Sequence, residues 1–333
     1  MRIFVVGDYK TGTGPANVTK EYLKRLRKGT LYQRFNSKLL RAAEIFVKSL
    51  FCDCILMSGY SAQNLLCIKA AKLFNKKTAY IVHGAITHEN KINHEENENM
   101  TNIEEKTLDG CDLLIAVSEK FAGWLKNNYP QYKEKITYVT NGVDFQIIRE
   151  SSRLKGKIKR DEKLIMSIGG GMPRKAIVNI CSAIEMLNKE GENLKLVVIG
   201  KDGFDTDKIN SYSFVENKGL VSNNEKTRLF YKSSLFIQNS LFETFGLAPV
   251  EALSCGVSIL TSSVAGVLDI LKGAKDEDII NNPEDIIELA VKIKNLLVNP
   301  NSERLLSGID EQNDSWENRT KELENVLDKL MSK

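Results

Sequence analysis

Two glutamates stand eight positions apart around a short turn, Glu243 before it and Glu251 after it. Pro249 is tolerated in a helix only within the first turn, which predicts a helix that begins near residue 247. The first backbone N–H groups of a helix have no intrahelical partners and can bind an anion. Here those groups belong to Phe245, Gly246 and Leu247. Carboxylates accept hydrogen bonds from hydroxyls, so carboxylates on both sides of an anion site favour a nucleotide-diphosphate sugar over a bare phosphate.

A second group of residues could neutralise the diphosphate. Gly169 follows a buried apolar run, and Arg174 and Lys175 stand just before a predicted helix. Cations are useful there because the departing nucleotide gains negative charge when the glycosidic bond breaks. Two solvated basic side chains at a helix start are the alternative interpretation.

The first half of the chain contributes two further candidates. A tight turn between the first apolar run and a helix is formed by Gly12, Thr13 and Gly14. It could lie near the donor phosphates, although an ordinary strand-to-helix turn explains the glycines as well. His83 closes the apolar run Ala79–Val82 and would face a crevice at the strand ends. A packed or turn histidine is the alternative.

The elements that must position these residues follow from the alternation of short apolar runs with helix-length segments. The predicted strands are Ile3–Gly7, Cys54–Met57, Ala79–Val82, Leu113–Val117, Ile136–Val139, Leu164–Ile168, Leu196–Ile199, Leu235–Ile237 and Ser258–Leu260. Such alternation implies parallel sheets with right-handed crossovers. We therefore expect an α/β protein with two Rossmann-like, doubly wound parallel-sheet domains and a ligand in the cleft at the strand ends.

The domain boundary is expected near Asp144, where the first series of strands ends. Residues 1–143 would form the acceptor-side domain and residues 144–314 the nucleotide-sugar domain. The charged interval 149–163 is predicted to be the linker. Residues 315–333 have apolar side chains at helical spacing, and this terminal helix could dock on either domain.

The stretch from Glu243 to Gly256, which includes Glu-x7-Glu and then Glu-Ala-Leu-x-Cys-Gly, resembles the retaining glycosyltransferases of family 4, also called group 1, with the GT-B fold. The resemblance extends from Gly219-Leu220-Val221 to Gly266. It implies that Glu251 holds the nucleotide ribose, that Glu243 faces the donor sugar and that the N–H groups of residues 245–247 meet the distal phosphate. It also implies that His83 lies near the reacting sugar and Val221 near the base.

Two positions depart from the family pattern. Gly170 stands where the family usually has an arginine, and Ala176 stands where it usually has a glycine. Arg174 could supply the lost charge from a neighbouring position. These departures put the strength of leaving-group stabilisation in question.

The expected activity is metal-independent, retaining transfer from a nucleotide-diphosphate sugar, with uridine favoured, to a glycan or lipid-linked acceptor in polysaccharide or glycoconjugate synthesis. The expected mechanism is front-face displacement, without a cofactor. The alternative is a weak or inactive GT-B protein that binds glycan or serves as a partner subunit. A dehydrogenase is disfavoured because no Gly-x-Gly-x-x-Gly with a later ribose acid is present. Asp205-Thr206-Asp207 has a metal-transferase spacing, but a solvated loop explains it better.

Composition narrows the remaining classes. The 333 residues carry a net charge of +4, too little to indicate nucleic acid. The six cysteines form no C-x-x-C pair, which predicts buried free thiols in the cytoplasm. Residues 20–50 contain nine Lys and Arg against two acids, a net charge of +7 with interleaved apolar side chains. This segment could contact the anionic inner face of the cell membrane, or it could be a solvated surface.

Overall fold

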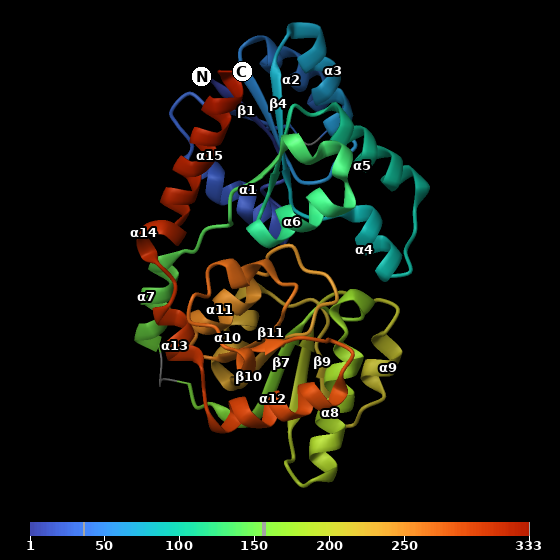
Figure 1. Ribbon diagram of the computed structural model, residues 1–333, viewed down its shortest axis with the longest axis vertical. Coiled ribbons are helices and arrows are strands. Elements are labelled where there is room, and N and C mark those ends of the chain that lie inside the picture. Colours follow the sequence, from blue (N-terminus) through green and yellow to red (C-terminus); the bar gives the residue numbers. More distant parts are fainter. Residues whose placement is uncertain (36, 155–157, 333) are drawn as a thin grey trace. The chain divides into compact units, whose positions relative to one another are not determined.

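The computed structural model describes residues 1–35, 37–154 and 158–332 (Figure 1). They divide into two compact units, which we call unit 1 and unit 2. Unit 1 comprises residues 1–90, 96–143 and 312–333, and unit 2 comprises residues 91–95 and 144–311. Each unit contains one six-stranded sheet in which every pairing is parallel.

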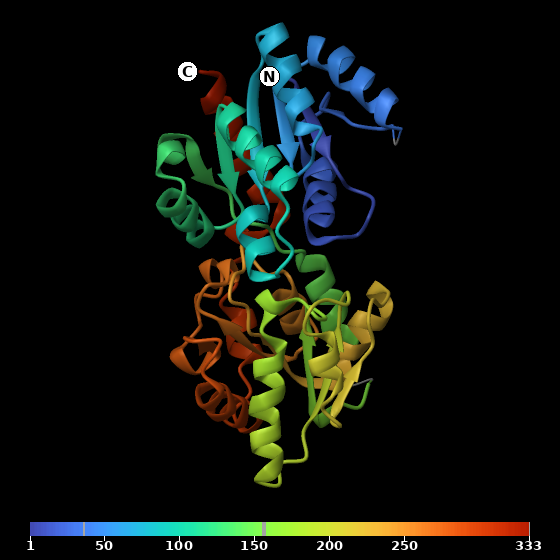
Figure 2. The same ribbon diagram turned by 90° about the vertical axis from the view of Figure 1, so that its right-hand side faces the viewer.

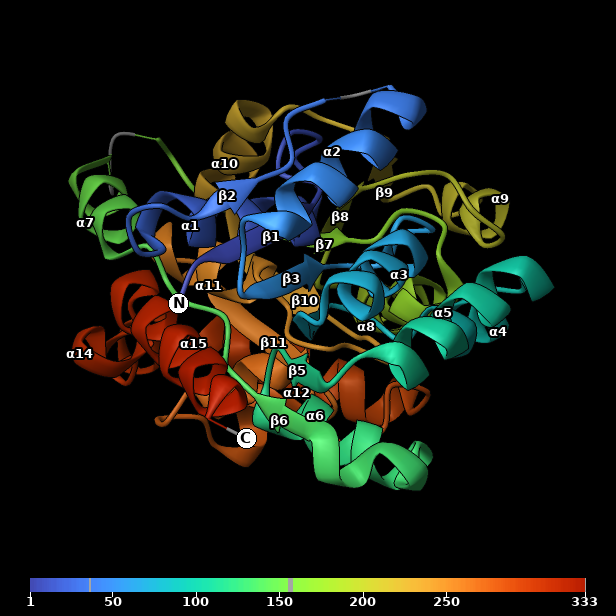
Figure 3. The ribbon, with the colours of Figure 1, turned by 90° about the horizontal axis from the view of Figure 1, so that it is seen from above.

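The sheet of unit 1 has the strand order β2-β1-β3-β4-β5-β6. Its strands are β1 (Ile3–Gly7), β2 (Leu31–Tyr32), β3 (Cys54–Ser58), β4 (Lys77–Val82), β5 (Leu113–Ala116) and β6 (Ile136–Tyr138). The helical elements are α1 (Gly14–Arg25), α2 (Lys38–Leu50), α3 (Asn64–Phe74), α4 (Ile86–Ile92), α5 (Glu98–Gly110), α6 (Glu119–Asn128), η1 (Pro130–Lys135), α14 (Glu311–Asp314) and α15 (Trp316–Met331). Figure 3 shows α1 and α15 on one face of this sheet and α2, α3 and α5 on the other.

The sheet of unit 2 has the strand order β12-β11-β10-β7-β8-β9. Its strands are β7 (Asp161–Ile168), β8 (Lys195–Ile199), β9 (Val215–Asn217), β10 (Ser233–Gln238), β11 (Ser258–Ser262) and β12 (Ile279–Ile280). The helical elements are α7 (Phe145–Leu154), η2 (Pro173–Lys175), α8 (Ile177–Lys189), α9 (Thr206–Asn210), α10 (Asn223–Lys232), α11 (Ala248–Ser254), η3 (Gly266–Asp269), η4 (Asp276–Asp278), α12 (Ile286–Val298) and α13 (Ser302–Ser307). Helices α8 and α12 pack together over the apolar core of this unit.

The structure confirms the predicted strands. Every residue of β3 is buried, and its first four residues are apolar, as expected for a strand covered on both faces. The sequence analysis missed β2, β9 and β12, which have only two or three residues each. All three lie at or next to a sheet edge, where little apolar surface is buried and the sequence pattern is weak.

Both sheets change winding direction beside their first strand. In unit 2 the chain runs from β7 outward to β9 and then returns to place β10 on the other side of β7. The loops that follow β7 and β10 therefore leave neighbouring strand ends in different directions, the arrangement at which open α/β sheets bind ligands. In unit 1 the equivalent position lies between β1 and β3.

The C-terminal helix α15 docks on unit 1, along α1 (Figure 1). Trp316 meets Tyr22 edge to face, with ring centroids 5.4 Å apart. Gly142 permits this packing, since a Cβ there would lie 2.6 Å from the indole ring. Arg25 pairs with Glu317 at 2.7 Å.

The predicted linker is wrong in part. Residues 145–154 form α7, and β7 already begins at Asp161, so much of the charged interval 149–163 is regular structure. Its centre, residues 155–157, lies outside the described residues. A helix such as α7 can be rich in charge when one face is solvated, which is why composition alone suggested a linker.

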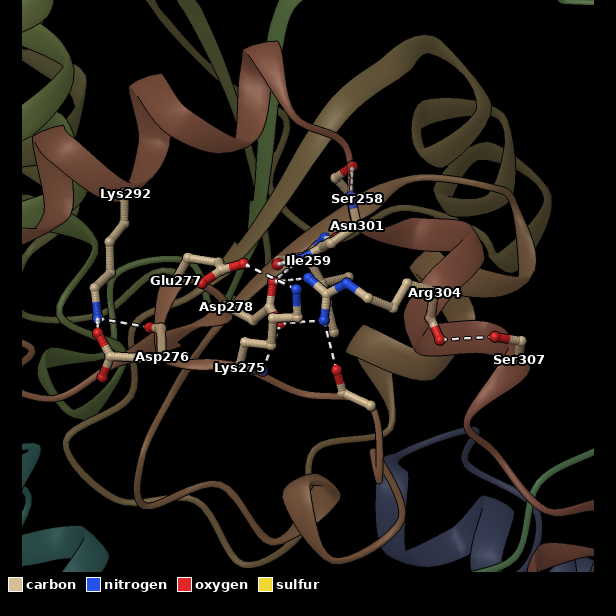
Figure 4. Close-up of polar contacts among 11 residues, drawn as sticks. Ser258, Ile259, Lys275, Asp276, Glu277, Asp278, Lys292, Asn301, Arg304 and Ser307 are labelled. Atoms are coloured by element: carbon tan, nitrogen blue, oxygen red, sulfur yellow. Dashed lines mark hydrogen bonds and ion pairs between the residues drawn. The ribbon is translucent and has the colours of Figure 1, made fainter.

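A buried ionic cluster fixes the β11–β12 edge of unit 2 (Figure 4). Arg304 donates two hydrogen bonds of 2.9 Å to the Asp278 carboxylate, which also accepts from Asn301 at 2.7 Å. Asn301 in turn binds the backbone N–H and C=O of Ile259 in β11. Asp278 is almost fully buried, so this carboxylate depends on its partners.

The six cysteines are buried and free, as predicted. Burial raises the pKa of Cys181 to about 12 and that of Cys255 to about 11, so both thiols stay protonated at neutral pH. Within the described ranges, no helix has the length and apolarity that crossing a bilayer requires.

Candidate functional site

The turn after β10 carries the first group of predicted site residues. Helix α11 begins at Ala248 with Leu247 at its N-cap and Pro249 in its first turn, as the proline position predicted. Gly246 adopts a φ of +90°, a region that favours glycine. A Cβ at Gly246 would lie 2.7 Å from the amide oxygen of Gln238, so the turn also needs glycine for close packing.

Glu243 forms a buried ion pair with Lys175. The Lys175 Nζ lies 2.5 Å from the Glu243 Oε2, and each side chain is only 12% exposed. The same carboxylate oxygen accepts a hydrogen bond of 3.1 Å from Gln238, whose own amide oxygen accepts from Thr261. Residues that follow β7 and β10 are thus brought together at the point where the sheet reverses its winding.

The electrostatics of this pair favour the charged state. Burial by itself would raise the pKa of the Glu243 carboxyl. The positive charges of Lys175 and Arg174 and a hydrogen bond from Lys175 outweigh that effect and hold the pKa below its ordinary value. Glu243 is therefore a carboxylate at neutral pH.

Arg174 is attached to the same turn through its backbone and its side chain. Its carbonyl accepts a hydrogen bond of 2.8 Å from Leu241 N–H, and its guanidinium donates to the Phe242 carbonyl at 3.4 Å. Arg174 thus places a positive charge beside the Lys175–Glu243 pair, although the family's usual arginine is replaced by Gly170.

The backbone after β7 leaves no room for an arginine side chain at position 170. A Cβ at Gly170 would lie 2.0 Å from the Lys201 carbonyl oxygen, and Gly170 has a φ of +56°. No side chain fits at that position in this backbone. A Cβ at Gly169 would lie 2.4 Å from the Lys175 Cγ, so Gly169 makes room for the lysine stem.

Glu251 has a partner that the sequence analysis missed. Lys226 of α10 donates to both carboxylate oxygens, at 2.7 and 2.8 Å. Glu251 remains 42% exposed and can still accept hydrogen bonds from a ligand. Val221 stands just before Ser222, the N-cap of α10, so it leads directly into the helix that holds Lys226. No motif marks Lys226, because the pairing joins two helices.

Unit 1 brings its own predicted residues together at the carboxyl ends of β1, β3 and β4. Helix α1 begins at Gly14 with Thr13 at its N-cap, and Gly12 has a φ of +77°. A Cβ at Gly59, just after β3, would lie within 4 Å of both His83 and Pro15. Pro15, directly after the turn of residues 12–14, therefore lies near His83.

His83 is held by a chain of hydroxyl groups. Its Nε2 lies 2.9 Å from the Ser58 hydroxyl, which lies 2.7 Å from the Thr19 hydroxyl. Burial lowers the pKa of His83 to about 4, so the imidazole is neutral at physiological pH. Sequence reasoning missed Ser58 and Thr19 because only the pairing of β3 with β4 and the packing of α1 bring them to His83.

The Asp205–Asp207 segment was predicted to be a loop, but most of it is helical. Residues 206–210 form the short helix α9, with Asp205 at its N-cap. In the part of the chain that the structure describes, no group of three or more His, Cys, Asp or Glu residues is placed to hold a metal ion.

Two family models match the chain and together span most of it. Residues 148–321 match the model of the glycosyl transferases group 1, and residues 12–147 match that of glycosyltransferase family 4. The probable sucrose-phosphate synthase of Thermosipho melanesiensis is 26% identical over 60% of this chain and 49% of its own length. Spore coat protein SA of Bacillus subtilis is 22% identical over 67% of this chain and 66% of its own length. The chain thus spans about half to two thirds of these relatives.

Solved structures share the fold along the entire chain. The Anabaena protein Alr3699/HepE, crystallised with UDP and glucose, superimposes with a TM-score of 0.72 at 13% identity and covers 99% of this chain and 100% of that one. Sucrose-phosphate synthase from Thermosynechococcus elongatus gives 0.72 at 17% identity, covering 100% and 99%. These likenesses and the two parallel sheets confirm the predicted GT-B fold with two Rossmann-like domains.

Proposed function

The chain belongs to the group 1 glycosyltransferases, and we propose that it transfers a sugar from a nucleotide-diphosphate donor, preferably a UDP-sugar, to a glycan or lipid-linked acceptor. The observation that carries the proposal is the Lys175–Glu243 pair beside Arg174, at the carboxyl edge of the unit 2 sheet. Two cations anchored around one carboxylate suit a site where a diphosphate must leave and a sugar must be oriented. That the Anabaena protein binds UDP supports uridine as the base.

Donor binding is assigned to the residues around β7, β10 and α11. The carboxylate of Glu251 accepts hydrogen bonds from the ribose hydroxyls, and Lys226 keeps it oriented for them. The N–H groups of residues 245–247 bind the distal phosphate. Gly169 allows the phosphates to approach the backbone, and Val221 lies beside the nucleotide base.

Transfer proceeds with retention by front-face displacement. The acceptor hydroxyl oxygen forms a bond to the anomeric carbon while the bond from that carbon to the phosphate oxygen breaks. The hydroxyl proton passes to the departing phosphate, and Lys175 and Arg174 stabilise its growing negative charge. Glu243, already ionised, accepts hydrogen bonds from the donor sugar. The reaction requires neither a metal nor a cofactor.

His83 contributes a hydrogen bond to the reacting sugar, and Gly12, Thr13 and Gly14 contribute a turn that approaches the donor phosphates. Because the pKa of His83 is lowered to about 4, the imidazole acts as a neutral hydrogen-bonding group and not as a cation. Its contact with Ser58 fixes the ring orientation. The buried free thiols support a cytoplasmic site of action.

Calorimetric titration of the metal-free protein with UDP, GDP, ADP and dTDP tests donor binding. We expect one of them to bind and Glu251→Ala to abolish binding. Glu216→Ala is the matched control, because Glu216 is an exposed glutamate of the same unit that also pairs with a lysine, Lys218. If none of the four nucleotides binds, or if both variants lose binding equally, the proposed donor site is wrong.

Release of nucleotide from the donor in the presence of acceptor separates an enzyme from the alternative, a GT-B protein that binds glycan or a partner without turnover. Gly170 favours the alternative because it removes the usual arginine, whereas Arg174 at the same turn favours catalysis. Acceptor-dependent release that Lys175→Ala abolishes would support the transferase. Nucleotide binding without any release would support the alternative.

A further inference from the structure

Helix α2 of unit 1 carries apolar side chains on two opposite faces. On its inner face Ile45 is fully buried, whereas Phe46, on the side toward α3, packs edge to face against Phe74 with ring centroids 6.4 Å apart. The outer face is lined by apolar side chains that are each more than half exposed: Leu39, Leu40, Val47 and Leu50. An ordinary surface helix has a polar outer face, so this second apolar face is not explained by the fold.

The outer side chains form one continuous stripe. Positions 40, 43, 47 and 50 are three or four residues apart, so they share one side of the helix. Leu39 is 84% exposed, Phe51 directly after the helix is 60% exposed and Leu73 on the adjoining α3 is 68% exposed. In Figure 2, α2 is the blue helix at the outer edge of unit 1. Contiguous apolar patches on soluble proteins usually mark an interaction site.

The charges around this stripe have one sign. Lys38, Lys69 and Lys72 are exposed on α2 and α3. The two acids between residues 34 and 77 are already engaged: Glu44 is buried and accepts from Lys48 and from backbone N–H groups, and Asp53 accepts from the backbone N–H of Arg2. The stripe is therefore apolar with a positive border.

Two of the basic residues in the first half of segment 20–50 are already engaged within unit 1. Arg25 pairs with Glu317, and Arg27 pairs with Glu324 and Asp328, all on α15. These arginines hold the C-terminal helix on unit 1. Lys20 and Lys28 stay exposed outside α2, and the exposed lysines on α2 and α3 themselves are Lys38, Lys69 and Lys72.

We propose that the outer apolar face of α2, formed by Leu39, Leu40, Val47 and Leu50 on the helix with Phe51 after it and Leu73 on α3, docks on an anionic lipid bilayer. Lipid tails accept the apolar stripe, and anionic headgroups accept the lysines at its border. A second copy of the chain is a poorer occupant, because two-fold pairing of this face would place lysines near lysines. With thirteen residues, α2 is about 20 Å long, too short to span a bilayer but suited to lie in its interface.

Vesicle flotation of the full chain tests this proposal, with phosphatidylcholine vesicles that either contain or lack phosphatidylglycerol. We expect binding only to the anionic vesicles, and we expect it to weaken as salt is raised. Lys38→Glu/Lys69→Glu/Lys72→Glu should weaken binding on the order of a hundredfold or more. Leu39→Ser/Val47→Ser/Leu50→Ser should also abolish flotation, and it leaves the buried face of α2 intact.

Ile287→Ser/Val291→Ser/Val298→Ser is the matched control, because it removes three exposed apolar side chains from one helix of unit 2. This variant should float like the unmodified protein. The absence of flotation with anionic vesicles, or equal losses in the α2 and α12 variants, would overturn the proposal. A dimer that the α2 substitutions dissociate, in a protein that binds no vesicles, would assign the face to a second copy instead. Nucleotide titration is measured separately, so a failure here leaves the donor site untouched.

Discussion

Substitutions in the Lys175–Glu243 pair should affect the stability of unit 2 and the turnover of the enzyme differently. Replacing Lys175 by methionine leaves the Glu243 carboxylate buried without its nearest cation. Removing one partner of a buried pair costs about 3–5 kcal/mol, because the other charge stays desolvated. Lys175→Met should therefore lower the free energy of unfolding of unit 2 by about that amount at pH 7.

The double variant Lys175→Met/Glu243→Gln should recover most of this loss, because replacing both charges by neutral groups of similar size is often close to neutral. Catalysis should not recover. The cation that we propose to stabilise the leaving group is absent from both variants, so turnover should fall by a factor on the order of 100 or more in each. Stability and turnover thus follow different patterns across the same pair of variants.

The assay must report on the correct unit. Both tryptophans, Trp124 and Trp316, lie in unit 1, so tryptophan fluorescence follows that unit alone. Unfolding of unit 2 in urea is followed by hydrogen exchange of the β7 and β10 amides, because far-UV circular dichroism sums the signals of both units. Lys189→Met is the matched control, because Lys189 and Glu185 form an exposed pair on α8 and such pairs contribute about 1 kcal/mol or less.

The pH dependence supplies a further check on the same reasoning. The pKa of Glu243 is lowered in the folded protein, so this group stabilises the fold above its ordinary pKa of 4.5, and that contribution is lost as the pH falls through the lowered value. In Lys175→Met burial should raise this pKa, so the stability deficit should shrink on acidification. A double variant as unstable as the single variant, or a Lys175→Met enzyme with full turnover, would refute this account of the pair.

Three further perturbations follow from single residues. Ala176 has a φ of +44°, so Ala176→Gly should stabilise unit 2 by roughly 1 kcal/mol, and an unchanged or lower unfolding free energy by hydrogen exchange of the β7 and β10 amides would contradict this. Asp278→Ala should cost about 1–3 kcal/mol in the same assay because it removes the acceptor of the buried Asn301 amide, and no measurable loss would show that the cluster is dispensable. The pKa of His83 falls from 6.5 to about 4 on folding, so the unfolded chain binds the proton more tightly and stability should decline by about 3 kcal/mol as the pH drops through that window. His83→Gln should remove that part of the pH dependence in tryptophan fluorescence, and a slope equal to that of the parent would refute it.

The elements that the sequence analysis predicted are those specified by local pattern. Strands such as β3 read as unbroken apolar runs because both of their faces are covered. The start of α11 was predictable because Pro249 acts through its own ring and needs no distant neighbour. The linker prediction was wrong in part because the exposed charges of Arg149 and Glu150 lie on a regular helix, α7.

The candidate site was predictable only as a set of residue types. Glu243, Glu251 and Lys175 could be chosen because a family motif marks them, and their roles remain proposals. No sequence motif identifies the residues that contact them. Lys226 reaches Glu251 from another helix, and Ser58 reaches His83 from a neighbouring strand.

By itself, the sequence determined which segments are buried, that they alternate as strand and helix, and that a helix begins just after residue 247, because these properties depend on neighbours a few positions away. Only the tertiary structure decided that Gly170 lies against Lys201, that α15 docks on unit 1 and consumes the charges of Arg25 and Arg27, and that the outer face of α2 stays uncovered. Each of these depends on contacts between segments far apart in the chain. Such contacts are set by packing and charge in three dimensions, and no spacing along the sequence encodes them.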